Sequence, residues 1–305
     1  MNHIIFIVGP TAIGKTGLSV YLAEKLKAEI FSADSMLIYR GADIITSKPG
    51  RDILEKIPHH FINIISPEEP YSVFDYYSQA LGDIRQLYKK GKNVIVCGGS
   101  GLYIKALLDG VFQGPGKNQD LRSQLSEEVE NCGNQAIYKK LQSVDAEAAS
   151  KISPNDTRRI IRALEVCYAS GSTFSELKKE AKGLRGELPL KIFGLNIKRQ
   201  LLYDRINKRV DEMFEAGAIE EVKKLLKMNL SLTAGKIIGV KEIRAYLDGD
   251  LSLDEAKELM KKNTRNFAKR QLTWFRKDKE IEWMDTGART TENIGEEIVN
   301  KLSEI

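Results

Sequence analysis

The chain has 305 residues, of which 42% are hydrophobic and 29% are charged, a composition that is ordinary for a globular protein. No run approaches the roughly 18 apolar residues of a membrane-spanning helix, and the start, MNHIIFIVGP, is too short and uncharged for a signal peptide. Three widely spaced cysteines, Cys97, Cys132 and Cys167, favour free thiols over disulfides or zinc, so we expect a cytoplasmic protein without a membrane partner.

The net charge of +5 is unevenly distributed along the chain. Residues 151–210 and 257–279 are rich in Lys and Arg, whereas residues 211–256 and 280–305 are acidic. Two basic blocks could form one positive face that attracts a polyanion, or they could be separate solvated helix surfaces. Charge alone leaves both interpretations open.

The first hundred residues alternate between strand and helix patterns. HIIFIV is typical of a buried strand, and GKTGLSVYLAEKL places Leu18, Leu22 and Leu26 on one helix face. AEIFSAD, HHFINII and NVIVCGG indicate further strands, and SVFDYYSQALGDIRQLYKKG indicates a long helix that ends at Gly91. This alternation predicts an α/β fold with a doubly wound parallel sheet.

The pattern changes after Leu108, where DGVFQGPGKN is rich in turn residues and indicates a boundary. The following residues, about 117 to 188, give helical patterns without a convincing strand, and LKIFGLNI at 190–197 returns to a strand pattern. The rest of the chain reads as helical. We therefore predict a core of residues 1–115 and 190–305 with a mainly helical insert, residues 116–189, and a helical C-terminal region.

The segment GPTAIGKT lies between the first strand and the first helix and matches the phosphate-binding loop G-x-x-x-x-G-K-[ST]. Backbone N–H groups and the helix N-terminus surround phosphate oxygens in such a loop, Lys15 adds a positive charge, and Thr16 offers a hydroxyl to Mg²⁺. The loop consists of Gly9, Pro10, Thr11, Ala12, Ile13, Gly14, Lys15 and Thr16. The motif predicts phosphate binding but does not say which compound carries the phosphates.

Two features of nucleotide hydrolases are missing from the sequence. NVIVCGGSG ends in Cys97, Gly98 and Gly99, where a hydrolase strand usually ends in a metal-binding Asp. There is also no N-K-x-D segment to bind guanine. These absences argue against a motor or a switch, although they leave a small-molecule kinase open.

Polar side chains follow two of the predicted strands. Asp34, at the carboxyl end of AEIFSAD, lies where ligands collect in parallel sheets, so it could accept a proton, hold Mg²⁺ through water, or simply cap a turn. Ser100, in GGSGLY, could point into the same crevice or serve only as a helix N-cap.

Arginines cluster in SPNDTRRIIRALEV, where Asn155 or Asp156 is the expected helix cap. Arg158 and Arg162 share a helix face with Arg159 beside them, an arrangement that suits phosphate or base recognition. TRNFAKRQLTWFRK mixes cations with Phe and Trp rings, which stack on bases in some proteins and form core in more.

Nine segments, in this order, resemble the tRNA dimethylallyltransferases (tRNA isopentenyltransferases) over nearly the whole chain. They are GPTAIGKT, SADSMLIYRGADIITSKP, PHHFINI, YSVFDY, GGSGLY, RRIIRALEV, RINKRVDEM, GVKE and AKRQLTWFR. The resemblance implies that the loop holds the diphosphate of dimethylallyl diphosphate rather than a nucleotide. It also implies transfer of the prenyl group to the exocyclic amine of the adenine immediately 3′ of the anticodon, after that base is extruded from its stack.

The resemblance also implies roles for individual residues. Asp34 matches the general base. The ligands of diphosphate and Mg²⁺ match Gly14, Lys15 and Thr16, with Thr16 as the metal ligand. Arg209 matches a further diphosphate-binding arginine. Ser100 is expected at the catalytic site as well. The positions that match tRNA contacts are Asp34, Ser35, Met36, Leu37, Ser100, Arg122, Arg158, Arg159, Ile160, Ile161 and Arg162.

Two other functions are compatible with the residues alone: a P-loop kinase for a nucleotide or small metabolite, and an RNA-binding protein that nucleotide regulates. A prenyltransferase needs tRNA, dimethylallyl diphosphate and Mg²⁺ but no ATP, and this distinguishes it from both. We expect this protein to be a monomer.

Overall fold

The computed structural model describes residues 2–116 and 118–303, which form two compact units. The core unit comprises residues 1–108 and 184–305, and the insert comprises residues 109–183. The N–H groups of Leu184 and Arg185 donate to the carbonyl oxygens of Leu107 and Leu108 at 2.8 and 2.9 Å. The chain therefore leaves and rejoins the core unit at neighbouring positions, and both boundaries lie earlier than the sequence predicted.

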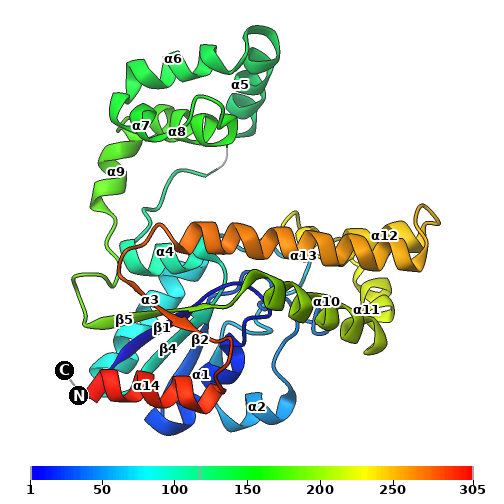
Figure 1. Ribbon diagram of the computed structural model, residues 1–305. Coiled ribbons are helices and arrows are strands. Elements are labelled where there is room, and N and C mark those ends of the chain that lie inside the picture. The colour runs from blue at the N-terminus through cyan, green and yellow to red at the C-terminus, as the bar shows by residue number, and fades with distance from the viewer. Residues whose placement is uncertain (1, 117, 304–305) are drawn as a thin grey trace. The chain divides into compact units, whose positions relative to one another are not determined.

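Within the described residues, the core unit contains one sheet of six parallel strands in the order β3-β2-β4-β1-β5-β6 (Figure 1). The strands are β1 (Ile4–Val8), β2 (Glu29–Ser32), β3 (His59–His60), β4 (Val94–Gly98), β5 (Leu190–Asn196) and β6 (Ile281–Asp285). This arrangement confirms the predicted α/β fold with a parallel sheet.

Two strands differ from the sequence-based prediction. β6 was not predicted, and the prediction that the chain is helical after residue 197 is wrong there. In HHFINII only His59 and His60 join the sheet, because the backbone turns at Phe61 and Asn63, which adopt φ angles of 64° and 57°.

Apolar helix faces cover both sides of the sheet, which explains why β1 is buried along its whole length. Leu18 and Leu22 pack with Ile5 on one side, and Tyr76 and Ile104 pack with Phe6 on the other. The helices of the core unit are α1 (Lys15–Leu26), α2 (Arg51–Lys56), α3 (Val73–Lys89), α4 (Gly101–Asp109), α10 (Arg199–Glu215), α11 (Ala218–Leu225), α12 (Val240–Leu247), α13 (Leu253–Phe275) and α14 (Thr291–Ser303), with the 3₁₀ helix η1 (Ala234–Lys236). In Figure 1, α14 lies beside α1 on one face of the sheet.

The long helix α13 begins at Leu253, and the preceding Ser252 is its N-cap, whose hydroxyl forms a capping box with the carboxylate of Glu255. It crosses the carboxyl edge of the sheet (Figure 1) and packs against α10. Near its C-terminal end, Gln271 and Trp274 contact the glycine turn that follows β4. This helix therefore forms part of the wall of the edge where ligands collect in parallel α/β proteins.

The insert is helical throughout its regular structure. Its helices are α5 (Gln119–Cys132), α6 (Asn134–Val144), α7 (Ala146–Lys151), α8 (Thr157–Ser170) and α9 (Phe174–Glu180). They surround a core of their own that includes Leu125, Ile137, Leu141, Ile160 and Leu164.

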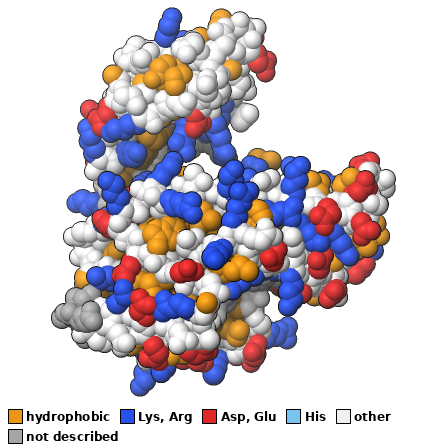
Figure 2. All heavy atoms as spheres, in the orientation of Figure 1, with side chains coloured by type: hydrophobic (Ala, Val, Ile, Leu, Met, Phe, Trp, Pro, Cys, Tyr) orange, Lys and Arg blue, Asp and Glu red, His pale blue; other side chains and the backbone are white. Residues whose placement is uncertain are grey.

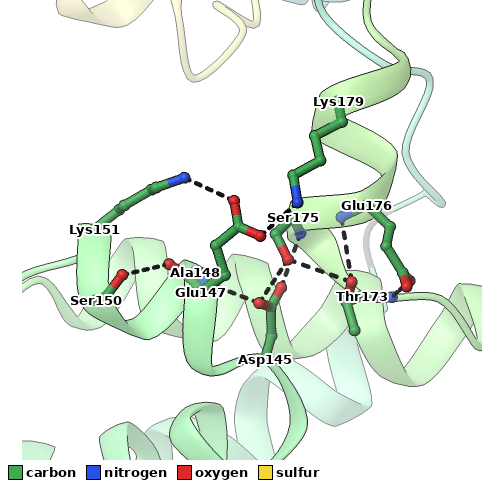
Figure 3. Close-up of polar contacts among 9 residues, drawn as sticks. All are labelled: Asp145, Glu147, Ala148, Ser150, Lys151, Thr173, Ser175, Glu176 and Lys179. Atoms are coloured by element: carbon green, nitrogen blue, oxygen red, sulfur yellow. Dashed lines mark hydrogen bonds and ion pairs between the residues drawn. The ribbon is translucent and has the colours of Figure 1, made fainter.

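Buried Asp145 joins two of these helices (Figure 3). Its carboxylate accepts hydrogen bonds from the N–H of Ala148 at 2.8 Å, and from the N–H and Oγ of Ser175 at 2.8 and 2.7 Å. Burial raises the pKa of Asp145, but these hydrogen bonds outweigh burial and leave that pKa below its ordinary value. On the surface above it, Glu147 pairs with Lys151 and Lys179 at 2.8 and 2.6 Å, so α7 and α9 are held together twice.

Candidate active site

The phosphate-binding loop has the conformation that its glycines permit. Gly9 and Gly14 adopt φ angles of 149° and 103°, and Ala12 also has a positive φ of 62°. A Cβ on Gly9 would lie 3.0 Å from the carbonyl oxygen of Leu195 on β5. The sequence prediction of a tight loop between a strand and a helix is therefore confirmed.

Residues Thr11 to Thr16 of this loop line a cavity of about 450 Å³ at the carboxyl edge of the sheet. Its other walls come from segments far away in the sequence. They are Asp34, Leu37, Thr46, Ser47, Cys97, Gly98, Arg205, Lys208, Arg209, Glu212 and Gln271. With Lys15 of the loop, the cavity is lined by four cationic side chains and by the two carboxylates of Asp34 and Glu212, so it suits an anion.

The surroundings of Lys15 in this cavity change its pKa strongly. Its Nζ donates a hydrogen bond to the carbonyl oxygen of Pro10 at 2.7 Å. Burial lowers the pKa of Lys15 to about 8, and nearby Arg209 lowers it as well, while Cys97 and Asp34 act in the opposite direction. The ammonium group thus lies close enough to Asp34 and Arg209 to interact with both charges.

Arg209, on α10, connects the phosphate loop to a second loop. Its Nη1 donates to the Thr11 hydroxyl at 3.1 Å, and its Nε donates to the Ser47 hydroxyl at 2.7 Å. Burial lowers the pKa of Arg209, and the negative charges of Asp34 and Glu212 raise it. Arg209, which the resemblance matches to a diphosphate-binding arginine, thus lies beside the phosphate loop.

Glu221 on α11 holds the second loop in place. Its carboxylate accepts hydrogen bonds from three successive backbone N–H groups, those of Asp43, Ile44 and Ile45, at 2.8 to 3.0 Å. Ser47, which follows in the same loop, has a φ of 53° and accepts from Arg209. The half-buried Arg209 and the Glu221 carboxylate therefore position this wall of the cavity.

Asp34 lies both at a turn and at the edge of two cavities. Its Oδ1 accepts a hydrogen bond from the N–H of Met36 at 2.9 Å, so it does cap the turn after β2. It also lines the phosphate-loop cavity and a second cavity of about 240 Å³. Strand β4 lies between β1 and β2, so Asp34 faces the phosphate loop across one strand.

The second cavity is mainly apolar. Most of its lining consists of Met36, Ile45, Ile206, Val210, Met213, Ile237, Ile238, Met260 and Phe267, with Lys236 and Arg270 among the polar groups. The two cavities share Thr11, Asp34, Thr46, Ser47 and Arg209. A polar anion site and an apolar site therefore meet at the Asp34 carboxylate.

Ser100 lines neither of the two cavities. Its hydroxyl accepts from the N–H of Ser35 at 3.0 Å and lies 3.2 Å from the Ser35 hydroxyl. The Ser35 N–H therefore engages this hydroxyl, and the two interpretations of Ser100, a group in the crevice or only a helix N-cap, stay predictions. Leu37 lines the phosphate-loop cavity, and Met36 lines the apolar one.

The remaining predicted residues lie in the insert. Asp156 caps α8 by accepting from the N–H of Arg159, so Asp156 rather than Asn155 is the cap. Buried Glu165 accepts two hydrogen bonds from Arg122, each at 2.8 Å, and one from Arg162 at 2.6 Å. These bonds outweigh the effect of burial and hold the pKa of Glu165 at about 2.

The predicted contact residues of the insert, on α5 and α8, are therefore not equivalent. The Arg122 and Arg162 side chains are held by Glu165 and remain about a third exposed, at 30% and 35%. The side chain of Ile160 is fully buried in the insert core, where it offers no surface to a ligand, whereas Arg158 and Arg159 are exposed.

Sequence reasoning missed Gln271, Ser47 and Glu221 as parts of the site. Gln271 lay inside the quoted segment AKRQLTWFR, but neither its type nor its spacing revealed a contact with the phosphate loop.

Figure 2 shows that Lys and Arg side chains gather along α13 on the face shown, and that Asp and Glu gather toward α11 and α12. In the aromatic segment, Phe267 lines the apolar cavity, and the Trp274 ring packs against Gly101.

Two features are absent from the part of the chain that the structure describes. None of the described helices has the length and apolar character to span a bilayer. No group of three or more His, Cys, Asp or Glu side chains in residues 2–116 and 118–303 is arranged to hold a metal ion.

Comparison with known proteins places the chain among relatives of one kind. Residues 37–278 match the family described as IPP transferase. The tRNA dimethylallyltransferase of Alkaliphilus metalliredigens is 46% identical over 304 residues, covering 99% of this chain and 97% of that protein.

Two solved structures are similar in fold as well as in sequence. The full-length tRNA isopentenylpyrophosphate transferase of Bacillus halodurans superposes with a TM-score of 0.72 at 39% identity, covering 100% of this chain and 98% of that one. A eukaryotic dimethylallyltransferase acting on tRNA gives a TM-score of 0.79 at 30% identity, covering 94% of this chain and 75% of that one.

Proposed function

The chain belongs to the IPP transferase family, and we propose that it transfers the dimethylallyl group of dimethylallyl diphosphate to tRNA, releasing diphosphate. The observation that carries this proposal is the meeting of two unlike cavities at Asp34. The polar, cationic cavity on the phosphate loop suits diphosphate. The apolar cavity beside it suits a flat base or a prenyl chain.

The acceptor in this proposal is the exocyclic amine of the adenine immediately 3′ of the anticodon. An amine inside a stacked anticodon loop cannot reach a buried donor, so the base has to leave its stack. The amine nitrogen then forms a bond to the terminal carbon of the prenyl group, while the bond from that carbon to the diphosphate oxygen breaks. Asp34 accepts the proton that the amine loses.

Charge develops on the departing diphosphate as this bond breaks. Lys15 and Arg209 lie around the cavity that would hold it, and the N–H groups at the start of α1 add their dipoles. These cations stabilise the transition state more than the ground state because the leaving group gains negative charge. The phosphate loop thereby serves prenyl transfer without a nucleotide.

The donor atoms at the site fit Mg²⁺, which prefers hard oxygen ligands and substrate phosphates. The Thr16 hydroxyl and the Asp34 carboxylate both line the cavity. We propose that Thr16 holds the ion with the diphosphate, where Mg²⁺ would neutralise phosphate charge.

We propose that the tRNA lies against both units. In the insert, the exposed Arg158 and Arg159 would contact phosphates. Arg122 and Arg162 would also contact phosphates, while their hydrogen bonds to Glu165 fix the orientation of their guanidinium groups. Ile161, also in the insert, would lie beside these arginines. In the core unit, Ser35, Met36 and Leu37 would contact the base, and Ser100 would support their turn. We further propose that the enzyme acts as a monomer in the cytoplasm, where its tRNA substrates are.

The test uses purified protein, isotopically labelled dimethylallyl diphosphate, unmodified tRNA and Mg²⁺, without any nucleoside triphosphate. We expect label in the tRNA and release of one diphosphate per transfer. A parallel reaction with γ-labelled ATP tests for a kinase. Transfer of the ATP label, with no prenyl label in tRNA, would contradict the proposal.

A further inference from the structure

We propose that Gln271 is a positioning residue that sets the distance between the phosphate loop and Asp34. This inference rests on the proposed function, because it assumes that a diphosphate on the loop and a proton acceptor at Asp34 act on one reaction. It concerns a side chain on α13 that the proposed mechanism does not itself use.

The side-chain amide of Gln271 accepts one hydrogen bond and donates another at the carboxyl edge of the sheet. Its Oε1 accepts from the backbone N–H of Thr11 at 2.8 Å, and its Nε2 donates to the carbonyl oxygen of Gly99 at 2.9 Å. The side chain is buried, with 5% of its surface exposed. One planar amide therefore joins the loop after β1 to the turn after β4.

Ser100, in the turn after β4, is hydrogen-bonded to the residues on both sides of Asp34. The N–H of Ser100 donates to the carbonyl oxygen of Ala33 at 3.1 Å, and the Ser100 hydroxyl accepts from the N–H of Ser35 at 3.0 Å. Asp34 thus lies between two residues that this turn fixes. Any movement of the turn relative to the phosphate loop would move Asp34 relative to the diphosphate.

The fit around this amide leaves little freedom. A Cβ on Gly99 would lie 2.2 Å from the Gln271 Nε2, so the glycine allows the close approach. Similarly, a Cβ on Gly101 would lie 2.3 Å from a ring carbon of Trp274, which follows Gln271 on α13. Because α13 packs against the turn at both points, the amide cannot shift without breaking one of its bonds.

The chemistry of the position requires an amide in particular. Gln offers one acceptor and one donor on the same plane, which the Thr11 N–H and the Gly99 carbonyl both need. An ionised Glu could still accept from Thr11, but it would place an oxygen lone pair against the Gly99 carbonyl and a negative charge beside the diphosphate. A protonated Glu could donate to Gly99 and would restore both bonds.

This difference between the two forms of Glu provides the test. Gln271→Glu and Gln271→Met are compared with the wild type by measuring kcat, and KM for each substrate, between about pH 6 and pH 8. Gln86→Glu, on the exposed surface of α3, is the matched control for adding a carboxylate. Thermal melting establishes that each variant is folded.

We expect Gln271→Met to lower kcat by about ten- to a hundredfold, since small misplacements of reacting groups cost this much, with KM for tRNA within about twofold of wild type. For Gln271→Glu, burial at this position and the facing Gly99 carbonyl should raise the pKa of the new carboxyl group from its ordinary value of about 4.3 into this range. The ratio of its kcat to that of the wild type should therefore rise at least about fivefold as the pH falls and the carboxyl group becomes neutral. The same ratio for Gln86→Glu should stay flat.

A folded Gln271→Met with wild-type kcat, or a flat ratio for Gln271→Glu, would overturn the inference. If Gln271→Met does not fold, the pH ratio of Gln271→Glu alone decides. A wild-type protein that transfers no prenyl group would instead refute the proposed function, and the inference with it, so the two failures are distinguishable.

Discussion

The pKa of Lys15 leads to a specific pH dependence of donor capture. Its ammonium group must be charged to bind diphosphate, and burial lowers its pKa to about 8 before the anion arrives. A lowered pKa means that charge is lost as pH rises through about 8. From pH 7 to pH 9 the charged fraction falls from about nine-tenths to about one-tenth, since each pH unit beyond a pKa changes the ratio of forms tenfold.

The quantity to measure is kcat/KM for dimethylallyl diphosphate at saturating tRNA, because this ratio reports ionisations of the form that captures the donor. We expect it to fall about tenfold between pH 7 and pH 9 in the wild type. Lys15→Arg keeps its charge throughout this range, so its profile should be lower but flat. Equal slopes for the two proteins, or a flat wild-type profile, would refute this account of Lys15.

Other predictions concern the proton acceptor and the insert. Asp34→Asn should lower kcat by about 10²- to 10⁴-fold in initial-rate assays while KM for the donor changes little, because the amide still caps the turn but cannot take a proton; near-normal turnover would exclude Asp34 as the base. Glu165→Ala should lower the free energy of unfolding by about 2–3 kcal/mol in denaturant titration, less than for fully buried pairs because its two arginine partners are partly exposed; unchanged stability would contradict a structural role. Arg158→Glu combined with Arg159→Glu should weaken tRNA binding and reduce its salt dependence, with the donor KM unchanged, and equal loss for both substrates would show that these arginines maintain the fold.

Local patterns made much of the fold predictable. The strand before GPTAIGKT is a continuous apolar run, the helix after it places Leu18, Leu22 and Leu26 four residues apart, and both appear in the structure. β6 lacks these signals, because it is a short strand at the edge of the sheet in which mainly Ile281 and Met284 are buried. Its strand identity comes from pairing with β5, which local sequence does not record.

The site shows the same division between local and distant information. The phosphate loop and Asp34 were predictable because they directly follow predicted strands. Gln271 was not, since its partner Thr11 lies 260 residues away and the contact depends on how α13 crosses the sheet. Ser100 and Ile160 were expected at ligand surfaces, but tertiary packing turns the first toward Ser35 and buries the second.

A crystal structure with both substrates bound would test most directly whether the phosphate loop grips an isoprenoid donor. The complex would contain a non-hydrolysable thio analogue of dimethylallyl diphosphate and an RNA hairpin with the sequence of an anticodon stem-loop. We expect the diphosphate against residues 9–16 and Arg209, with the adenine out of its stack and its exocyclic amine within hydrogen-bonding distance of Asp34. A diphosphate bound elsewhere, or an adenine that remains stacked away from Asp34, would contradict this account.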